Sequence, residues 1–172
     1  MPFNPTHPTV RKVLEKDIEI LVPRVKDYKS LHSIVLSNEP AFAAAYGTYY
    51  LPQYHEYLKE KYGTIEELNR AYGGSEYASF DEIGWPRAAK ANPYWHDYRV
   101  FNDEILNEYH HYLAAAVKKY APDVPVHTKQ MSNFRAVTPP ANYDYRMNGA
   151  NYELWMDAFD INGTDGGGAA FN

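Results

Sequence analysis

The octapeptide Ser33-Ile34-Val35-Leu36-Ser37-Asn38-Glu39-Pro40 joins a short aliphatic run to two polar residues and a proline. The run is too short for a helix and is typical of a strand buried on both faces. Pro40 cannot donate to a strand ladder, so we expect the strand to end before it. Barrel enzymes place catalytic groups at the carboxyl ends of such strands. Glu39 is therefore either a catalytic candidate or an exposed loop residue, and the octapeptide alone favours neither.

Helical patterns alternate with strand candidates on both sides of this octapeptide. Apolar residues at steps of three and four predict an amphipathic helix over residues 10–28, with Thr9 as its N-cap and a kink or a frayed end at Pro23. Proline, glycine and capping residues delimit the other predicted helices, which are residues 52–63, 64–73, 93–121 and 151–158. Two further strand candidates cover residues 124–131 and 159–165. This alternation predicts an α/β fold with a parallel sheet.

The segment between the first two strand candidates is unusually long. About 85 residues separate them, whereas a minimal crossover between parallel strands needs roughly 10–12. Residues 41–92 are therefore predicted to form a helical insertion on the face where Glu39 emerges.

Composition excludes several classes of function. The net charge is −5 and the 17 Lys and Arg residues are scattered, which argues against a nucleic-acid groove. The absence of Cys excludes disulfides and thiolate metal sites. No apolar run has membrane-spanning length and residues 1–30 lack a signal-peptide core, so we expect no membrane partner, and both a cytoplasmic and a secreted location stay open. The 17 Tyr, 7 Phe and 3 Trp suit a sugar-binding cleft, although tyrosine also fills wet interfaces.

Four other stretches strengthen the case for Glu39. They are Tyr-Leu-Lys-Glu-Lys-Tyr-Gly-Thr-Ile-Glu-Glu-Leu-Asn at 57–69, Phe-Asp-Glu-Ile at 80–83, Trp-Pro at 85–86 and Pro-Asp-Val-Pro-Val-His-Thr at 122–128. Together with Ser-Asn-Glu-Pro at 37–40, they resemble the glycoside hydrolases of family 42, the β-galactosidase type. The resemblance runs from about residue 10 to residue 165. The run at 57–69 is its most specific part.

The resemblance implies a retaining glycosidase built on a (β/α)8 TIM barrel, in clan A. Residues 1–172 would then be a partial catalytic domain, from about the third helix to the sixth strand, with the helical insertion after the fourth strand. By motif, Glu39 is the acid/base and Asn38 contacts the sugar hydroxyl next to the anomeric carbon. The family's nucleophile, a Glu on the seventh strand, has no counterpart in residues 1–172. We expect the substrate to be a β-galactoside in an oligo- or polysaccharide, and the chemistry requires no metal or organic cofactor.

The remaining candidates surround this pair. Aromatic loop residues could stack on a sugar ring, and polar residues at strand ends could contact its hydroxyls; these candidates are Phe42, Tyr46, Trp85, His127, Lys129, Asn162 and Asp165. His127 and Lys129 could equally pair with carboxylates inside the barrel. Because Lys129 makes the fifth strand more basic than the family pattern, an agarase-like or other galactan-directed specificity is an alternative. His110 and His111 are adjacent on a helix and face different directions, so they are not read as a metal pair.

A rival interpretation is a non-catalytic or degenerate carbohydrate-binding barrel module. It would keep the aromatic cleft without a second carboxylate. A strand that ends in Glu about a hundred residues further along the gene would favour the enzyme, given the ~250 residues of a barrel. Under either interpretation the partner is a carbohydrate, the isolated chain is expected to be inactive, and a homo-oligomer of the full-length protein stays open.

Overall fold

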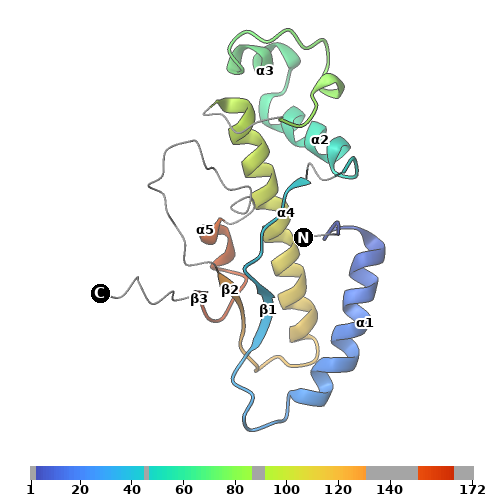
Figure 1. Ribbon diagram of the computed structural model, residues 1–172, viewed down its shortest axis with the longest axis vertical. Helices are drawn as coiled ribbons and strands as arrows, with labels where there is room; N and C mark the ends of the chain where they lie inside the picture. Colours follow the sequence, from blue (N-terminus) through green and yellow to red (C-terminus); the bar gives the residue numbers. More distant parts are fainter. Residues whose placement is uncertain (1–2, 45–46, 87–91, 131–150, 165–172) are drawn as a thin grey trace, which may run out of the picture.

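The computed structural model describes residues 3–44, 47–86, 92–130 and 151–164. Helices pack along one side of a small sheet, and the long helix α4 forms the spine of the molecule (Figure 1). The elements in chain order are α1 (Pro8–Val25), β1 (Ile34–Asn38), α2 (Leu51–Tyr62), α3 (Ile65–Ala71), the 3-10 helix η2 (Phe80–Glu82), α4 (Pro93–Lys118), β2 (Val126–Gln130), α5 (Tyr152–Trp155) and β3 (Gly163–Thr164).

The sheet has the strand order β1-β2-β3, and both neighbouring pairs are parallel. This confirms the parallel α/β arrangement that the alternation of helices and strands predicts. The third strand is shorter than the predicted span 159–165. Asp160, which precedes β3, is instead joined to the start of β2 by two hydrogen bonds. Its backbone N–H donates to the carbonyl of Val126, and its carboxylate accepts from the backbone N–H of Val126.

A β-bulge interrupts the pairing of β1 with β2. Val35 pairs with His127 and Asn38 pairs with Lys129, so β1 advances three residues while β2 advances two. The extra residue turns two consecutive side chains of β1 towards the helices. Leu36 lies against α1, and the hydroxyl of Ser37 contacts α4.

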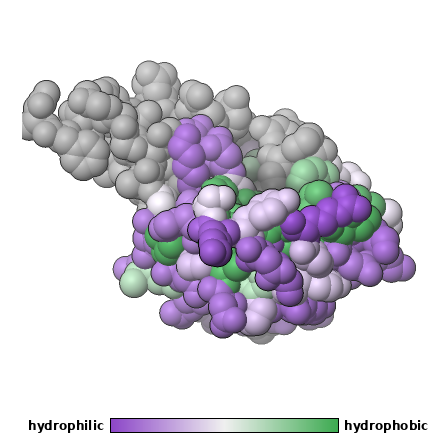
Figure 2. Space-filling view, turned by 90° about the horizontal axis from the view of Figure 1, so that it is seen from below, coloured by the Kyte–Doolittle hydropathy of each residue, from purple (hydrophilic) through white to green (hydrophobic). Residues whose placement is uncertain are grey.

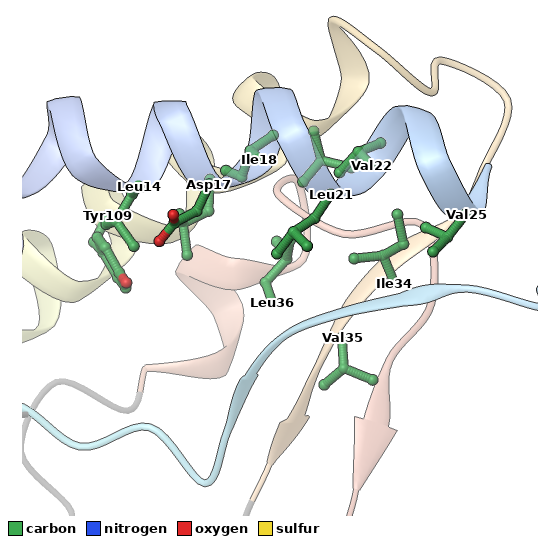
Figure 3. A pocket seen from close by; sticks show the side chains of 12 residues that line it. Leu14, Asp17, Ile18, Leu21, Val22, Val25, Ile34, Val35, Leu36 and Tyr109 are labelled. Carbon is green, nitrogen blue, oxygen red and sulfur yellow. The ribbon is translucent and has the colours of Figure 1, made fainter.

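The sequence predicts a strand buried on both faces, and in the described part of the chain one face of β1 is covered. Ile34 and Leu36 point towards α1, whereas Val35 points to the opposite side of the sheet and is 51% exposed (Figure 3). Among the described residues, no element covers that second face. The apolar run is therefore half-buried here, and its hydrophobic character alone could not reveal which face is covered.

Local signals place the helix ends well. Asn92 caps α4 by accepting from the backbone N–H of Trp95, as the Asn-Pro pair predicts. Thr64 accepts from the backbone N–H of Glu67 at the start of α3, as the predicted capping box requires. The prediction of Thr9 as the cap of α1 is wrong: His7 is the N-cap and its ring accepts from the backbone N–H of Thr9. A proline fits the first turn of a helix, so α1 begins at Pro8 itself.

The main core lies between α2, α3 and α4 and extends to α5. Its fully buried side chains include Tyr54, Leu58, Leu68, Leu106 and Trp155. A smaller cluster between α1, α4 and β2 contains Val22, Val117 and Val126. Figure 1 shows α2 and α3 packed on the amino-terminal part of α4, beyond the carboxyl end of β1.

Several large hydrophobic side chains are exposed on α1, on β1 and on the segment between them. Hydrophilic residues dominate the end seen from below in Figure 2, with hydrophobic side chains between them. The exposed residues are Val13, Ile20 and Leu21 on α1, Tyr28 after it and Val35 on β1. No helix in the described ranges combines the length and the apolar character that crossing a bilayer requires.

Candidate functional site

Glu39 lies immediately after β1 in a strained backbone conformation. Its φ angle is 45°, and it is the one residue other than glycine with positive φ in the described part of the chain. The left-handed region costs a residue with a Cβ roughly 1–2 kcal/mol. Its backbone N–H donates to the carbonyl of Lys129 at 2.7 Å, and this bond holds the turn against β2. The side chain is exposed. Such strain concentrates at functional sites, where the surrounding structure enforces it.

The backbones of Asn38, Glu39 and Lys129 adjoin at this edge of the sheet. Asn38 pairs in register with Lys129 on β2, and Glu39 follows directly. Asn38 is exposed and Lys129 is partly buried. The carboxyl ends of parallel strands form the edge at which α/β enzymes bind ligands. Three of the predicted site residues are thus brought together.

His127 lies near the amino end of β2, away from the edge that carries Glu39. It lies opposite Val35, and its Nε2 is 3.1 Å from the hydroxyl of Ser33, which precedes β1. Gly163 makes room for it, because a Cβ there would lie 2.8 Å from Nδ1 of His127. His127 therefore has partners within the sheet, towards the strand end remote from Glu39.

The aromatic candidates separate into different environments. Phe42 is 3% exposed and packs edge-on against Tyr50, so its ring belongs to the core. Trp85 is partly buried; it stacks on Tyr54 with ring centroids 5.2 Å apart, and its indole N–H donates to the carbonyl of Gly47.

The strand-end candidates also differ. Asn162 is exposed directly before β3. Tyr46 and Asp165 lie outside the described residues. Asp160 is held by Lys118 at 2.8 Å, and the hydrogen bond from Lys118 lowers the pKa of this carboxyl. Asp160 therefore has a structural role at the start of β2.

Sequence reasoning missed the role of His110. Its side chain is fully buried between α4 and β1, with Nδ1 2.8 Å from the carbonyl of Leu106 and Nε2 2.7 Å from the hydroxyl of Ser37. Burial lowers its pKa from 6.5 to about 4, so the ring is neutral at pH 7. A signal for this existed in the sequence. His110 belongs to a second helical stripe that is buried beside the predicted one, namely Asn102, Leu106, His110, Leu113 and Val117.

The glycoside hydrolase family 42 model, described as "Beta-galactosidase", matches residues 1–165. The chain belongs to this family.

Curated members of the family resemble the chain over part of their length. A β-galactosidase of Geobacillus kaustophilus is 30% identical over 153 residues, which cover 82% of this chain and 22% of the relative. A β-galactosidase of Arthrobacter is 30% identical over 140 residues, or 76% of this chain and 20% of the relative. The chain thus spans about a fifth of the length of these family 42 enzymes.

Solved structures of family 42 enzymes show the same arrangement. A β-galactosidase from Bacillus circulans superposes with a TM-score of 0.72 at 26% identity, covering 95% of this chain and 24% of that one. A family 42 exo-carrageenase from Bacteroides ovatus superposes with a TM-score of 0.70 at 26% identity, covering 95% and 23%. The α/β architecture of this chain is therefore that of the family 42 barrel enzymes.

The strain at Glu39 of this family 42 chain leads to a stability prediction. We expect Glu39→Gly to be more stable than Glu39→Ala by roughly 1 kcal/mol. Glycine adopts the left-handed conformation without strain, and the greater entropy that it gives the unfolded chain offsets only part of this advantage. Thermal unfolding of the two full-length variants measures the difference. Val35 lies in a strand without positive φ, so Val35→Gly should be less stable than Val35→Ala. An Ala variant at residue 39 as stable as the Gly variant would show that the turn is not strained.

Burial of His110 predicts sensitivity to acid. Between pH 6.5 and about 4 the unfolded chain binds a proton at this residue and the folded chain does not. Stability therefore falls as the pH drops through this window, by about 3 kcal/mol in total. Hydrogen-exchange protection of β1 and α4, corrected for intrinsic exchange rates, should follow this loss. His110→Phe should remove it, whereas His111→Gln, at an exposed position, should retain it.

Proposed function

We propose that the chain is part of a retaining β-galactosidase in which Glu39 is the acid/base. The observation that carries the proposal is the strained, exposed Glu39 beside Asn38 at the carboxyl end of a parallel strand. Family membership supplies the reaction class. In this assignment β1 is the fourth strand of a (β/α)8 barrel, and β2 and β3 are the fifth and the sixth. Residues 41–92 are the insertion that borders the active face.

The chemistry follows from two carboxyl groups. Glu39 protonates the leaving glycosidic oxygen while a nucleophilic Glu from outside residues 1–172 attacks the anomeric carbon and forms a glycosyl-enzyme. Glu39, now a carboxylate, then takes a proton from the attacking water, which releases the sugar with retained configuration. Two carboxyl groups carry out each step of this reaction, so the proposed chemistry requires no metal.

The surrounding residues complete the proposed sugar site. Asn38 contacts the hydroxyl next to the anomeric carbon. The exposed Asn162 lies directly before Gly163, which pairs with Lys129, and the partly buried Trp85 borders the site from the insertion. His127 is left out of this site, because its ring bonds to Ser33 towards the other end of the strands. Phe42 supports the loop from the core, because its buried ring leaves no face for a sugar.

A direct test follows the stereochemistry of hydrolysis. The full-length protein is expected to cleave nitrophenyl β-galactoside faster than the corresponding glucoside, and NMR should detect the β-anomer of galactose first. Release of the α-anomer first would contradict the retaining mechanism. Sugar binding without hydrolysis would favour the carbohydrate-binding alternative.

A second candidate substrate is an anionic galactan. Lys129 lies in register with Asn38 at the same strand edge, and its positive charge is of the sign that would attract an acidic substituent of the sugar. The exo-carrageenase relative agrees with this candidate, because carrageenans are sulfated galactans.

Substitution of Lys129 distinguishes the two substrates. If the natural substrate is sulfated, we expect Lys129→Met to raise KM for sulfated galactan oligosaccharides about tenfold, the equivalent of a charge-assisted contact of roughly 1.4 kcal/mol. KM for lactose should change less than twofold. Lys16→Met, on the exposed surface of α1, is the control. Equal effects of Lys129→Met on both substrates would remove the anionic galactan from consideration.

A further inference from the structure

A chain of buried polar groups joins α4 to the end of β1, directly before Asn38 and Glu39. Nε2 of His110 lies 2.7 Å from the hydroxyl oxygen of Ser37. That oxygen lies 2.7 Å from the hydroxyl oxygen of Thr128 on β2, and the hydroxyl of Thr128 also reaches the carbonyl of Ser37 at 2.9 Å. His110 and Thr128 are both fully buried.

The carbonyl of Leu106 determines which nitrogen of His110 carries the proton, and therefore which groups donate in the rest of the network. The carbonyl of Leu106 can only accept, so Nδ1 of His110 carries the proton of the neutral ring. Nε2 must then accept, and the hydroxyl of Ser37 donates to it. The single proton of the Thr128 hydroxyl is then shared between two acceptors of Ser37, its carbonyl oxygen at 2.9 Å and its hydroxyl oxygen at 2.7 Å. Every donor in the chain has an acceptor, and the hydrogen bonds run in one direction from Thr128 through Ser37 to His110 and Leu106.

This network holds the bulge of β1 in place. Ser37 lies within the bulge, between the pairs Val35–His127 and Asn38–Lys129. Without the extra residue, Ser37 would face away from the helices and Asn38 would face towards them. The bulge thus turns Asn38 to the face that Val35 shares and starts the left-handed turn at Glu39.

The ring of His110 is itself firmly packed. Its centroid lies 4.8 Å from the ring of Trp155 on α5 and 5.5 Å from that of Phe159. A side chain held by an i−4 carbonyl on its own helix and by two aromatic rings offers Ser37 an acceptor at a fixed point.

We propose that His110 is a positioning residue for Asn38 and Glu39, acting through the hydroxyl of Ser37 and the bulge. This inference rests on the proposed role of Glu39 as the acid/base. His110 touches no substrate. It sets the direction in which β1 delivers its two polar side chains to the sugar.

The test uses His110→Phe and Ser37→Ala in the full-length protein. His110→Phe keeps an aromatic ring beside Trp155 and removes the acceptor, and Ser37→Ala removes a single oxygen atom. Tyr112→Phe is the matched control, because it also removes one hydrogen bond of α4, to the carbonyl of Arg11, away from β1.

We expect kcat on lactose to fall 10- to 100-fold in both variants, as about 1 Å of displacement at a reacting group would produce. The leaving group of dinitrophenyl galactoside departs without a proton, so the fold-loss of kcat on this substrate should be at least ten times smaller than on lactose. KM for both substrates should change little. The double variant should lose no more than the single variants, because both act through one hydroxyl. If His110→Phe does not fold, Ser37→Ala alone carries the test.

A purely structural role gives another result. If folded variants have lower melting temperatures but kcat within twofold of the wild type on both substrates, as Tyr112→Phe should, the positioning role is wrong. Glu39→Gln is measured in the same assays to tell whether the positioning role of His110 alone is wrong or the acid/base role of Glu39 is wrong as well. Equal losses of Glu39→Gln on both substrates would overturn the acid/base role and the positioning role with it.

Discussion

Replacing Glu39 with Gln in the full-length protein is expected to slow hydrolysis of lactose about 10²–10⁴-fold, the contribution typical of general acid catalysis. Gln keeps the shape of the side chain but has no proton to transfer. Lactose has a poor leaving group and needs that proton at the transition state. Dinitrophenyl galactoside does not, so the first step on this substrate should slow far less.

The second half of the reaction gives an independent check. Without a general base, water attacks the glycosyl-enzyme slowly, and the intermediate should accumulate on dinitrophenyl galactoside. Azide, which needs no base, should restore turnover and give β-galactosyl azide. Glu66→Gln, on the surface of α3, is the control and should behave like the wild type. Equal losses on the two substrates, together with no effect of azide, would mean that Glu39 positions the sugar or the turn.

Removing the carboxylate of Asp97 is expected to produce a large loss of stability. Asp97 on α4 is 1% exposed and accepts from the amine of Lys61 at 2.6 Å and from the hydroxyls of Tyr62 and Tyr72 at 2.7 and 2.9 Å. Burial raises the pKa of both tyrosines, so they remain protonated donors. One carboxylate thus binds α2 and the end of α3 to α4.

Asp97→Ala leaves an amine and two hydroxyls without their acceptor, and removing one partner of a buried ion pair typically costs about 3–5 kcal/mol. Hydrogen exchange in the full-length protein should show the loss first in α2 and α3, with β1 and β2 less affected. Glu108→Ala breaks the more exposed pair with Arg11 and should cost about 1 kcal/mol or less. Similar losses in the two variants would show that Asp97 is not the anchor of α2 and α3.

Much of the fold can be predicted from local sequence. Thr64 and Asn92 cap their helices as predicted, because a cap depends on a side chain and on backbone N–H groups only two or three residues away. The alternation of apolar stripes and short aliphatic runs indicates a parallel sheet for a similar local reason. The octapeptide shows Asn38 and Glu39 as polar residues at the end of an aliphatic run, and the resemblance of the surrounding motifs to family 42 makes them site candidates.

Other features depend on residues that are distant in sequence. Whether Val35 is covered depends on what lies on the second face of the sheet, and the buried state of Phe42 depends on Tyr50 and α4. The positive φ of Glu39 could not be predicted locally, because the residue is not a glycine and does not belong to a recognisable turn motif. It arises where the carbonyl of Lys129, about ninety residues further along the chain, fixes the direction of the backbone.

The sequence therefore singles out Asn38 and Glu39 as candidates at the end of β1, and the tertiary structure determines the backbone conformation and the neighbours of these two residues. Helix caps and amphipathic stripes are set by interactions within one turn or one strand, which the order of residues encodes directly. The bulge at Ser37 and the neutral, buried ring of His110 require α4 and β2 to be packed against β1. Desolvation and long-range hydrogen bonds act only after that packing exists, so no local pattern could reveal them.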